Sequence, residues 1–138
     1  MRLFKGPMPI EAISEIIAKS RQDLNCGAHS LFIDQVKREQ SDGKFLKAVE
    51  FSAYEEMVIQ EANKINKTII SEYEGVRSIE IIHSTGLIKP GEISLVIMVS
   101  AFNHEHASKA CIKAIELIKE KLPVLRKELY ESDLGDSD

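Results

Sequence analysis

The chain has 138 residues, of which 43% are hydrophobic and 29% are charged, as expected for one globular domain with a sizeable core. A formal net charge of −4 argues against general binding to nucleic acids, which depends on neutralising phosphates. No apolar run approaches the roughly 20 residues that cross a bilayer, and the N-terminus lacks the layout of a signal peptide, so we expect a cytoplasmic protein with no membrane partner.

The first part of the chain alternates between strand and helix patterns. Residues 2–5 favour a short strand, and isoleucines at helical spacing predict an amphipathic helix over residues 9–21. Residues 28–36 form a second predicted strand, followed by a polar loop in which Ser-Asp-Gly marks a turn. Strand alternation resumes over residues 45–53, and we predict that these last two strands pair as a long antiparallel hairpin.

The middle of the chain changes from helical to strand periodicity. One apolar stripe predicts a helix over residues 54–73, and alternation predicts a strand over residues 76–84. Turn signals follow at Thr85-Gly86 and at Lys89-Pro90-Gly91. Residues 93–102 are apolar on both parities, which predicts a central strand covered on both faces.

The C-terminal part begins with the most clearly patterned helix. Apolar residues recur at helical spacing from Ala107 to Leu122, and Pro123 ends the helix. Residues 124–130 favour an edge strand. Residues 1–129 are therefore expected to form a single domain, with residues 130–138 as an acidic, disordered tail.

The order of these elements defines the expected fold class. It is β-α-β-β-α-β-β-α-β, with hairpins among the strands and no internal repeat. This order favours an α+β fold, with a mostly antiparallel sheet and three helices, over a doubly wound parallel sheet.

The histidines and cysteines do not predict a metal centre or a disulfide. A zinc site needs three or four converging ligands, and the two histidines of His104-x-His106 at a helix start cannot share one helical face. His29 is interpreted as a hydrogen-bonded strand histidine. Cys26 and Cys111 form no Cys-x-x-Cys motif and are expected to be reduced.

Basic residues concentrate near the C-terminal helix. Between His104 and Lys127 there are six Lys or Arg and three Glu, a local excess that suits a small anionic ligand or an acidic partner. Lys119 lies at the edge of the apolar face, where it is either a surface lysine or a partly desolvated acid, base or nucleophile. We expect the helix start near His104 to meet the basic residues from Lys119 to Lys127 at one anion site.

Several short motifs occur in the order and spacing of one known family. The matching stretches are Gly27-Ala28, Val49 to Met57, His83 with Gly86, Pro90 to Ser100, Ala110-Cys111, Ile118-Lys119 and Pro123 to Glu128. With these motifs the chain resembles the MoaE family, the large, catalytic subunits of molybdopterin synthase. The likeness runs from about Gly27 to Glu128.

The resemblance implies a MoaE-like α/β hammerhead fold and a role in molybdenum cofactor biosynthesis. Large subunits of this family dimerise, and each receives the Gly-Gly tail of a small ubiquitin-like subunit of the MoaD type, which gives a heterotetramer. The thiocarboxylate on that tail donates sulfur twice to cyclic pyranopterin monophosphate, an anionic pterin, and so forms the dithiolene of molybdopterin. No cofactor is implied.

The resemblance also assigns roles to individual residues. Lys119 occupies the position of the family's essential lysine, and Arg126 that of its second catalytic lysine. His104 is the third catalytic candidate, because the family's His-Arg pair aligns with Asn103-His104, or with His104-Glu105 after a shift of one residue. The substrate-binding residues implied are Lys37, Arg38, Asn103 and Lys127.

The sequence departs from the family pattern at several charged positions. The arginine of the His-Arg pair is missing, and Lys37 replaces the arginine of a Val-Arg pair. Arginine stays protonated at physiological pH, so Arg126 is expected to bind charge, leaving proton transfer to Lys119 or His104. The leading hypothesis is an active synthase subunit. The alternative is a catalytically weakened or inactive relative that acts as a dimeric binding module for a ubiquitin-like partner.

Overall fold

Three helices and seven strands make up residues 1–131, the part of the chain that the computed structural model describes. In chain order they are β1 (Arg2–Lys5), α1 (Ile10–Ser20), β2 (Ala28–Gln35), β3 (Gln40–Ser41), β4 (Lys44–Ser52), α2 (Glu55–Glu72), β5 (Val76–Ile88), β6 (Ile93–Ala101), α3 (His104–Lys121) and β7 (Leu125–Tyr130). All three predicted helices are present. Tyr130, which we assigned to the tail, is the last residue of β7, and residues 132–138 of the predicted tail lie outside the described residues.

The sheet is mostly antiparallel, as predicted for an α+β fold. Its strands run in the order β2-β6-β5-β4-β3, with β7 paired to β4 and β1 paired parallel to β5. Strand β6 lies between β2 and β5. The predicted edge strand at the C-terminus is β7, whose described partner is β4.

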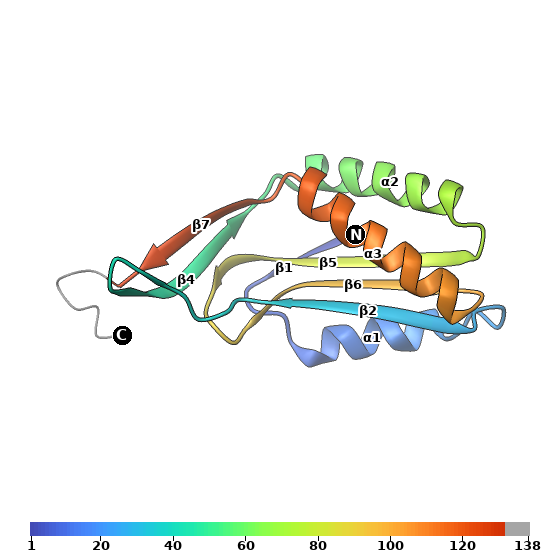
Figure 1. Cartoon of the computed structure of the whole chain (residues 1–138), viewed down its shortest axis with the longest axis horizontal. Helices are drawn as coiled ribbons and strands as arrows, with labels where there is room; N and C mark the ends of the chain where they lie inside the picture. Colours follow the sequence, from blue (N-terminus) through green and yellow to red (C-terminus); the bar gives the residue numbers. More distant parts are fainter. Residues whose placement is uncertain (132–138) are drawn as a thin grey trace.

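Helices cover both faces of the sheet (Figure 1). Helices α2 and α3 lie on one face, where Leu95, Ile97 and Val99 of β6 join their core. Helix α1 lies on the other face, where Val96 and Met98 pack against its apolar residues. The double coverage explains why residues of both parities in β6 are apolar, since each buried Val, Leu, Ile or Met side chain stabilises the fold by about 1.5–3 kcal/mol.

The predicted hairpin between residues 28–36 and 45–53 is wrong. Strand β2 pairs with β6, and β4 pairs with the end of β5 and with β7. The Ser-Asp-Gly turn does exist, but it joins the two-residue strand β3 to β4. Asp42 and Gly43 both have positive φ, 51° and 76°, the backbone geometry of a tight two-residue hairpin.

The predicted turn at Thr85-Gly86 is also wrong, because β5 continues to Ile88. Gly86 has φ of 92°, a conformation that glycine adopts without a steric penalty. Before this point β5 pairs with β6 and, up to Thr85, with β1, and from Gly86 onward it pairs with β4. The glycine therefore marks the place where one strand changes partners. The predicted turn at Lys89-Pro90-Gly91 is present between β5 and β6.

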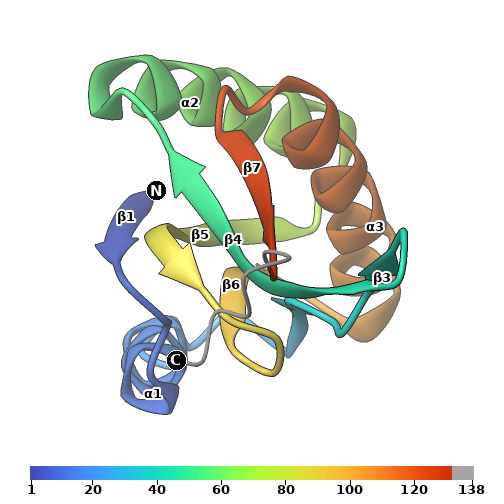
Figure 2. The same ribbon diagram turned by 90° about the vertical axis from the view of Figure 1, so that its left-hand side faces the viewer.

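Strands β4 and β7 extend past the end of the helix-covered sheet, and we call this pair the β4–β7 arm (Figures 1 and 2). A separate small core that includes Leu46, Val49, Phe51 and Ile88 supports it. The arm meets the C-terminal end of α3, where β7 begins shortly after Pro123. Among residues 1–131, no helix is long and apolar enough to span a bilayer.

Candidate functional site

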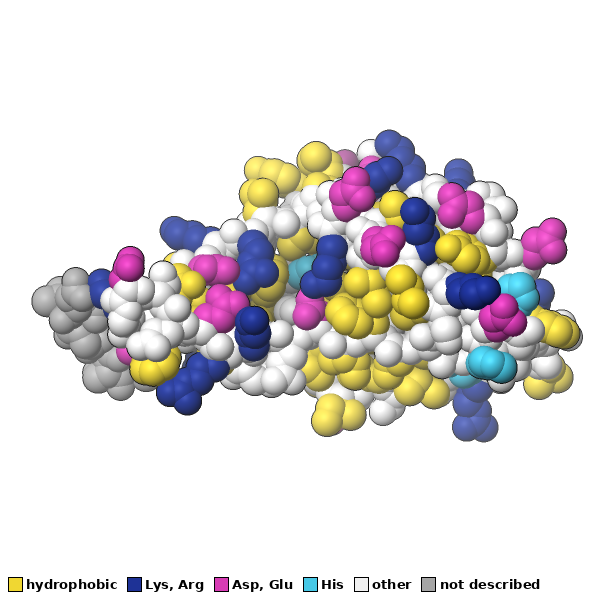
Figure 3. All heavy atoms as spheres, viewed as in Figure 1, with side chains coloured by type: hydrophobic (Ala, Val, Ile, Leu, Met, Phe, Trp, Pro, Cys, Tyr) yellow, Lys and Arg dark blue, Asp and Glu magenta, His cyan; other side chains and the backbone are white. Residues whose placement is uncertain are grey.

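A cavity of about 530 Å³ lies where β2, the β4–β7 arm and the end of α3 meet. Its size falls in the range of about 300–1,000 Å³ that is usual for small-ligand sites. Its charged lining residues are Asp34, Lys37, Glu39, Lys119 and Arg126, which sum to a formal charge of +1. Figure 3 shows basic and acidic side chains interleaved on this face. The cavity therefore suits a small anionic group.

Lys119 reaches the cavity from the last turns of α3. Its Nζ donates a hydrogen bond to Asp34 Oδ2 at 2.6 Å and lies 5.8 Å from the centroid of the Phe32 ring. Phe32 and Asp34 share one face of β2, since burial alternates along this strand. The two charged side chains are 51% and 34% exposed, so their ion pair stabilises the fold by at most about 1 kcal/mol.

Arg126 lines the cavity from β7. Its guanidinium pairs with Glu128 Oε1 at 3.2 Å and lies 6.0 Å from the centroid of the Phe51 ring, its cross-strand neighbour on β4. Lys37 follows β2 and also lines the cavity. Three cations from three elements thus converge around one space, and two of them already have an acidic partner.

His83 is the buried titratable group of the cavity. Its Nδ1 lies 2.8 Å from the carbonyl oxygen of Ser84, which can only accept, so Nδ1 carries the proton and Nε2 is left as an acceptor. The ring packs edge-on against Phe51 at 5.1 Å between centroids. Burial lowers the pKa of His83, an effect that the Ser84 carbonyl and Asp34 partly oppose. Burial therefore favours the neutral form of His83, which lines the same cavity as the three cations.

The opposite end of α3 holds Asn103 and His104. Asn103 is the N-cap of the helix, and its side-chain oxygen accepts a hydrogen bond from the backbone N–H of His106 at 3.1 Å. His104 precedes Lys119 by fifteen residues of continuous helix, which separates them by roughly 22 Å at about 1.5 Å per residue. The prediction that both helix ends meet at one anion site is therefore wrong within a single chain.

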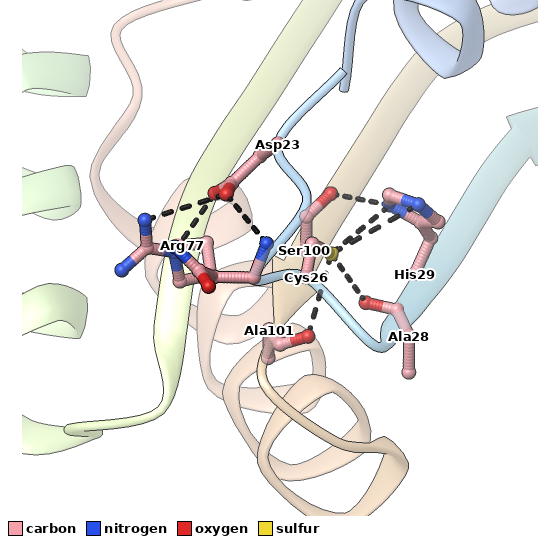
Figure 4. Close-up of polar contacts among 8 residues, drawn as sticks. Asp23, Cys26, Ala28, His29, Arg77, Ser100 and Ala101 are labelled. Carbon is pink, nitrogen blue, oxygen red and sulfur yellow. Dashed lines mark hydrogen bonds and ion pairs between the residues drawn. The ribbon is translucent and has the colours of Figure 1, made fainter. Parts of the chain in front are cut away.

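A second polar cluster surrounds Cys26, close to this N-terminal end (Figure 4). The Cys26 thiol donates to the carbonyl oxygens of Ala101 and Ala28, at 3.4 and 3.5 Å. It lies 3.9 Å from both ring nitrogens of His29, so it is not aligned with either one. His29 Nδ1 is 2.6 Å from Ser100 Oγ, which confirms its interpretation as a hydrogen-bonded strand histidine.

Both cysteines are free, as predicted. Cys111 is buried and its thiol faces the carbonyl oxygen of Ser30 at 3.7 Å, and burial raises its pKa. Within residues 1–131, no three His, Cys, Asp or Glu side chains lie close enough together to hold a metal ion.

Comparison with known proteins decides the family. The family model described as MoaE protein matches residues 5–121. The chain belongs to the MoaE family.

Relatives of this MoaE chain are molybdopterin synthase proteins. The molybdopterin synthase catalytic subunit of Drosophila erecta is 31% identical over 133 residues, 96% of this chain and 35% of the relative. That of Drosophila virilis is 34% identical over 134 residues, 97% of this chain and 37% of the relative. The chain thus spans about a third of the length of these curated relatives.

Solved structures share the fold over almost the whole chain. Molybdopterin synthase from Staphylococcus aureus matches with a TM-score of 0.81 and 27% identity, covering 94% of this chain and 90% of that one. A complex of subunits 1 and 2 of molybdopterin-converting factor from Helicobacter pylori matches with a TM-score of 0.76 and 18% identity, covering 97% and 91%. The hammerhead fold expected from the resemblance is confirmed.

The structure brings together three of the seven predicted site residues. Lys37, Lys119 and Arg126 line the cavity. Arg38 instead lies 4.5 Å above the centroid of the Phe45 ring, and Lys127 follows Arg126 on an extended strand and so points to its other face. The roles of His104 and Asn103 in catalysis and substrate binding stay predictions, about 22 Å from Lys119 along one helix.

Three titratable lining residues were missing from the predicted site: Asp34, Glu39 and His83. The alternation of β2 contained a signal for Asp34, because it places Phe32 and Asp34 on one face. His83 shares its parity with the buried Ile79 and Ile81, which marked it as an inward-facing histidine. Glu39 lies in a loop with no periodic pattern, and no sequence signal identified it.

Proposed function

We propose that this MoaE chain is the large subunit of a cytoplasmic molybdopterin synthase. In this role it dimerises, binds a small ubiquitin-like subunit with a thiocarboxylated C-terminus, and transfers sulfur to cyclic pyranopterin monophosphate. Family membership supports the proposal, as does 27% identity over 90% of the matched chain of Staphylococcus aureus molybdopterin synthase. The observation that carries it is the convergence of Lys119, Arg126 and Lys37 on one cavity.

Each sulfur transfer requires two bonds to form and two to break. The thiocarboxylate sulfur attacks an oxygen-bearing carbon of the pterin precursor, and a C–S bond forms as the C–O bond at that carbon breaks, its oxygen leaving as water or staying with the phosphate. The small subunit is then joined to the precursor as a thioester. The acyl–sulfur bond must then break, with the acyl group passing to water or to the amine of Lys119. The sulfur remains on the pterin, and after hydrolysis the small subunit carries an ordinary carboxylate. A second round completes the dithiolene.

Some lining residues are suited to bind the negative charge of the precursor, and others are suited to transfer protons. Arg126 and Lys37 are suited to hold the phosphate of the precursor, because guanidinium and ammonium groups bind phosphate oxygens strongly. Lys119 meets the thiocarboxylate end and acts as acid, base or acyl acceptor. His83 lines the same cavity and has Nε2 left as an acceptor, so it is suited to take a proton.

Reconstitution tests the proposal. The purified chain is mixed with a thiocarboxylated MoaD-type subunit and cyclic pyranopterin monophosphate, and molybdopterin is measured. We expect product only when the small subunit carries the thiocarboxylate and not the carboxylate. Absence of product with a small subunit that co-elutes with the chain would contradict the proposed activity.

The alternative function, a dimeric binding module without catalysis, is favoured by one observation. Two of the three cavity cations are already paired, Lys119 with Asp34 and Arg126 with Glu128. Stable docking of the thiocarboxylated subunit together with no measurable product, even at stoichiometric enzyme, would establish this alternative.

A further inference from the structure

The carboxylate that holds Lys119 comes from within the chain itself. Asp34 lies near the end of β2, where the pairing with β6 changes register between Asp34 and Gln35. Irregularities of this kind redirect side chains at the ends of strands. The Asp34 side chain reaches Lys119 Nζ at 2.6 Å, a short, charge-assisted hydrogen bond. The ammonium group is thus occupied before any ligand arrives.

The carboxylate of Asp34 is chemically similar to the C-terminal group of the proposed small subunit. A peptide chain ends in a carboxylate, and the thiocarboxylate is its sulfur analogue. Lys119 can exchange one carboxylate for another without losing a charged partner, while the Phe32 ring still supports its ammonium. Asp34 is 34% exposed, so its released carboxylate can be hydrated at little cost.

Asp34 contributes a large share of the formal charge of the cavity lining. The lining carries three cations and two anions, a formal sum of +1. Replacing Asp34 by an uncharged residue doubles that sum to +2 and frees Lys119. Replacing Glu39 changes the sum equally, but Lys119 pairs with Asp34 and not with Glu39 in the described part of the chain. Comparing variants of Asp34 and Glu39 therefore distinguishes competition for Lys119 from a general change in the charge of the cavity.

We propose that Asp34 is a positioning residue that competes with the partner's C-terminal carboxylate for Lys119. Building on the proposed function, this exchange assists release of the spent small subunit, which leaves the reaction as a carboxylate. When that chain end withdraws, Asp34 takes back the ammonium group and blocks its return. The residue therefore weakens product binding and speeds turnover.

A titration tests the competition directly. Uniformly ¹⁵N-labelled protein is titrated with a short peptide that ends in Gly-Gly with a free carboxylate, and the dissociation constant is measured by NMR. Asp34→Asn is expected to bind this peptide about two- to fivefold more tightly than the native protein, as removal of an exposed ion pair allows. Asp34→Glu keeps the competing charge and is expected to bind like the native protein.

The matched controls are a second variant and two further ligands. Glu39→Gln removes the same charge from the lining and is expected to change the affinity less than about twofold, since Glu39 does not occupy Lys119. The affinity for the same peptide with an amidated C-terminus is expected to be the same in Asp34→Asn as in the native protein. No gain for the free-acid peptide, an equal gain in Glu39→Gln, or an equal gain for inorganic phosphate would overturn the proposal.

Steady-state kinetics distinguish this role from a general loss of structure, because damage to the fold would not lower KM. In the reconstituted reaction, Asp34→Asn is expected to lower both kcat and the KM for the small subunit, because the spent subunit leaves more slowly. A raised KM would contradict the proposal. The titrations require no sulfur transfer, so failure of the exchange and failure of the proposed synthase activity are observed separately.

Discussion

The two ends of helix α3 are both rich in polar residues, but they differ in the described residues 1–131: at the C-terminal end these residues line a cavity, and at the N-terminal end they bond the backbone. At the N-terminal end, Asn103 caps the helix and the Cys26 thiol bonds backbone carbonyls. At the C-terminal end, Lys119 faces cations contributed by two other elements. Polar groups that are hydrogen-bonded to the backbone stabilise the fold. Polar groups that line a cavity are available to bind a ligand.

The difference follows from the topology of the sheet. The β4–β7 arm extends beyond the helix-covered strands, and β7 follows closely on the C-terminal end of α3 (Figures 1 and 2). The arm supplies Arg126 and Phe51, and the loop after β2 supplies Lys37. We therefore expect substitutions at the N-terminal end to change stability, and substitutions at the cavity to change binding and turnover.

The largest expected change in stability is at Gly27, beside the N-terminal end of α3. A Cβ atom on this residue would overlap the backbone carbonyl oxygen of Phe102, which cannot move without disturbing the helix start. Gly27→Ala is expected to lower the free energy of unfolding by about 1–3 kcal/mol, the usual range for overpacking. Urea denaturation measures this. An unchanged midpoint would show that the close packing at this end is not needed.

His83 is expected to make stability depend on pH at the cavity end. Burial lowers its pKa, so the folded state binds a proton less readily than the unfolded state, whose histidine titrates near about 6.5. Stability is therefore fully present above that pH and falls on acidification, by at most about 1.4 kcal/mol per pH unit for this one group.

Denaturation at several pH values, compared between the native protein and His83→Gln, isolates this contribution from the other histidines. The native protein is expected to lose stability more steeply between pH 7 and pH 5. Parallel curves for the two proteins would show that burial of His83 does not disfavour its charged form.

Asn103→Ala tests the structural role of the N-terminal end of α3, and its expected loss of stability is smaller than that of Gly27→Ala. Loss of an N-cap side chain costs about 1 kcal/mol, and we expect that loss of stability with unchanged affinity for the Gly-Gly peptide. The substrate-binding role implied by the family resemblance predicts reduced turnover in addition to this loss of stability. Denaturation and the reconstituted assay on one preparation distinguish the two.

Much of this architecture was predictable from the sequence because it is local. Helical spacing located all three helices, and the apolar run from Ile93 identified the strand buried on both faces. Strand pairing was not predictable in the same way, since β2 pairs with β6, whose partner residues lie 58 to 73 positions later, and no local pattern specifies that choice. Gly86 misled the prediction because positive φ serves bends within strands as well as turns.

The candidate site was predictable only in part for a similar reason. Family motifs identified Lys119, Arg126 and Lys37, but the contact between Lys119 and Asp34 spans 85 positions in the chain. The separation of His104 from Lys119, in contrast, followed from the length of the predicted helix, at about 1.5 Å per residue. A strict use of helix geometry would have kept the two ends of α3 apart from the start.

The most direct test of the central claim is the turnover of Lys119→Ala in the reconstituted reaction. Lys109→Ala is the matched control, because Lys109 is an exposed lysine on the same helix that pairs with Glu105 away from the cavity. The account predicts that Lys119→Ala forms molybdopterin at least about 100-fold more slowly while Lys109→Ala keeps the native rate. Equal rates for the two variants would contradict the assignment of the sulfur-transfer site to the C-terminal end of α3.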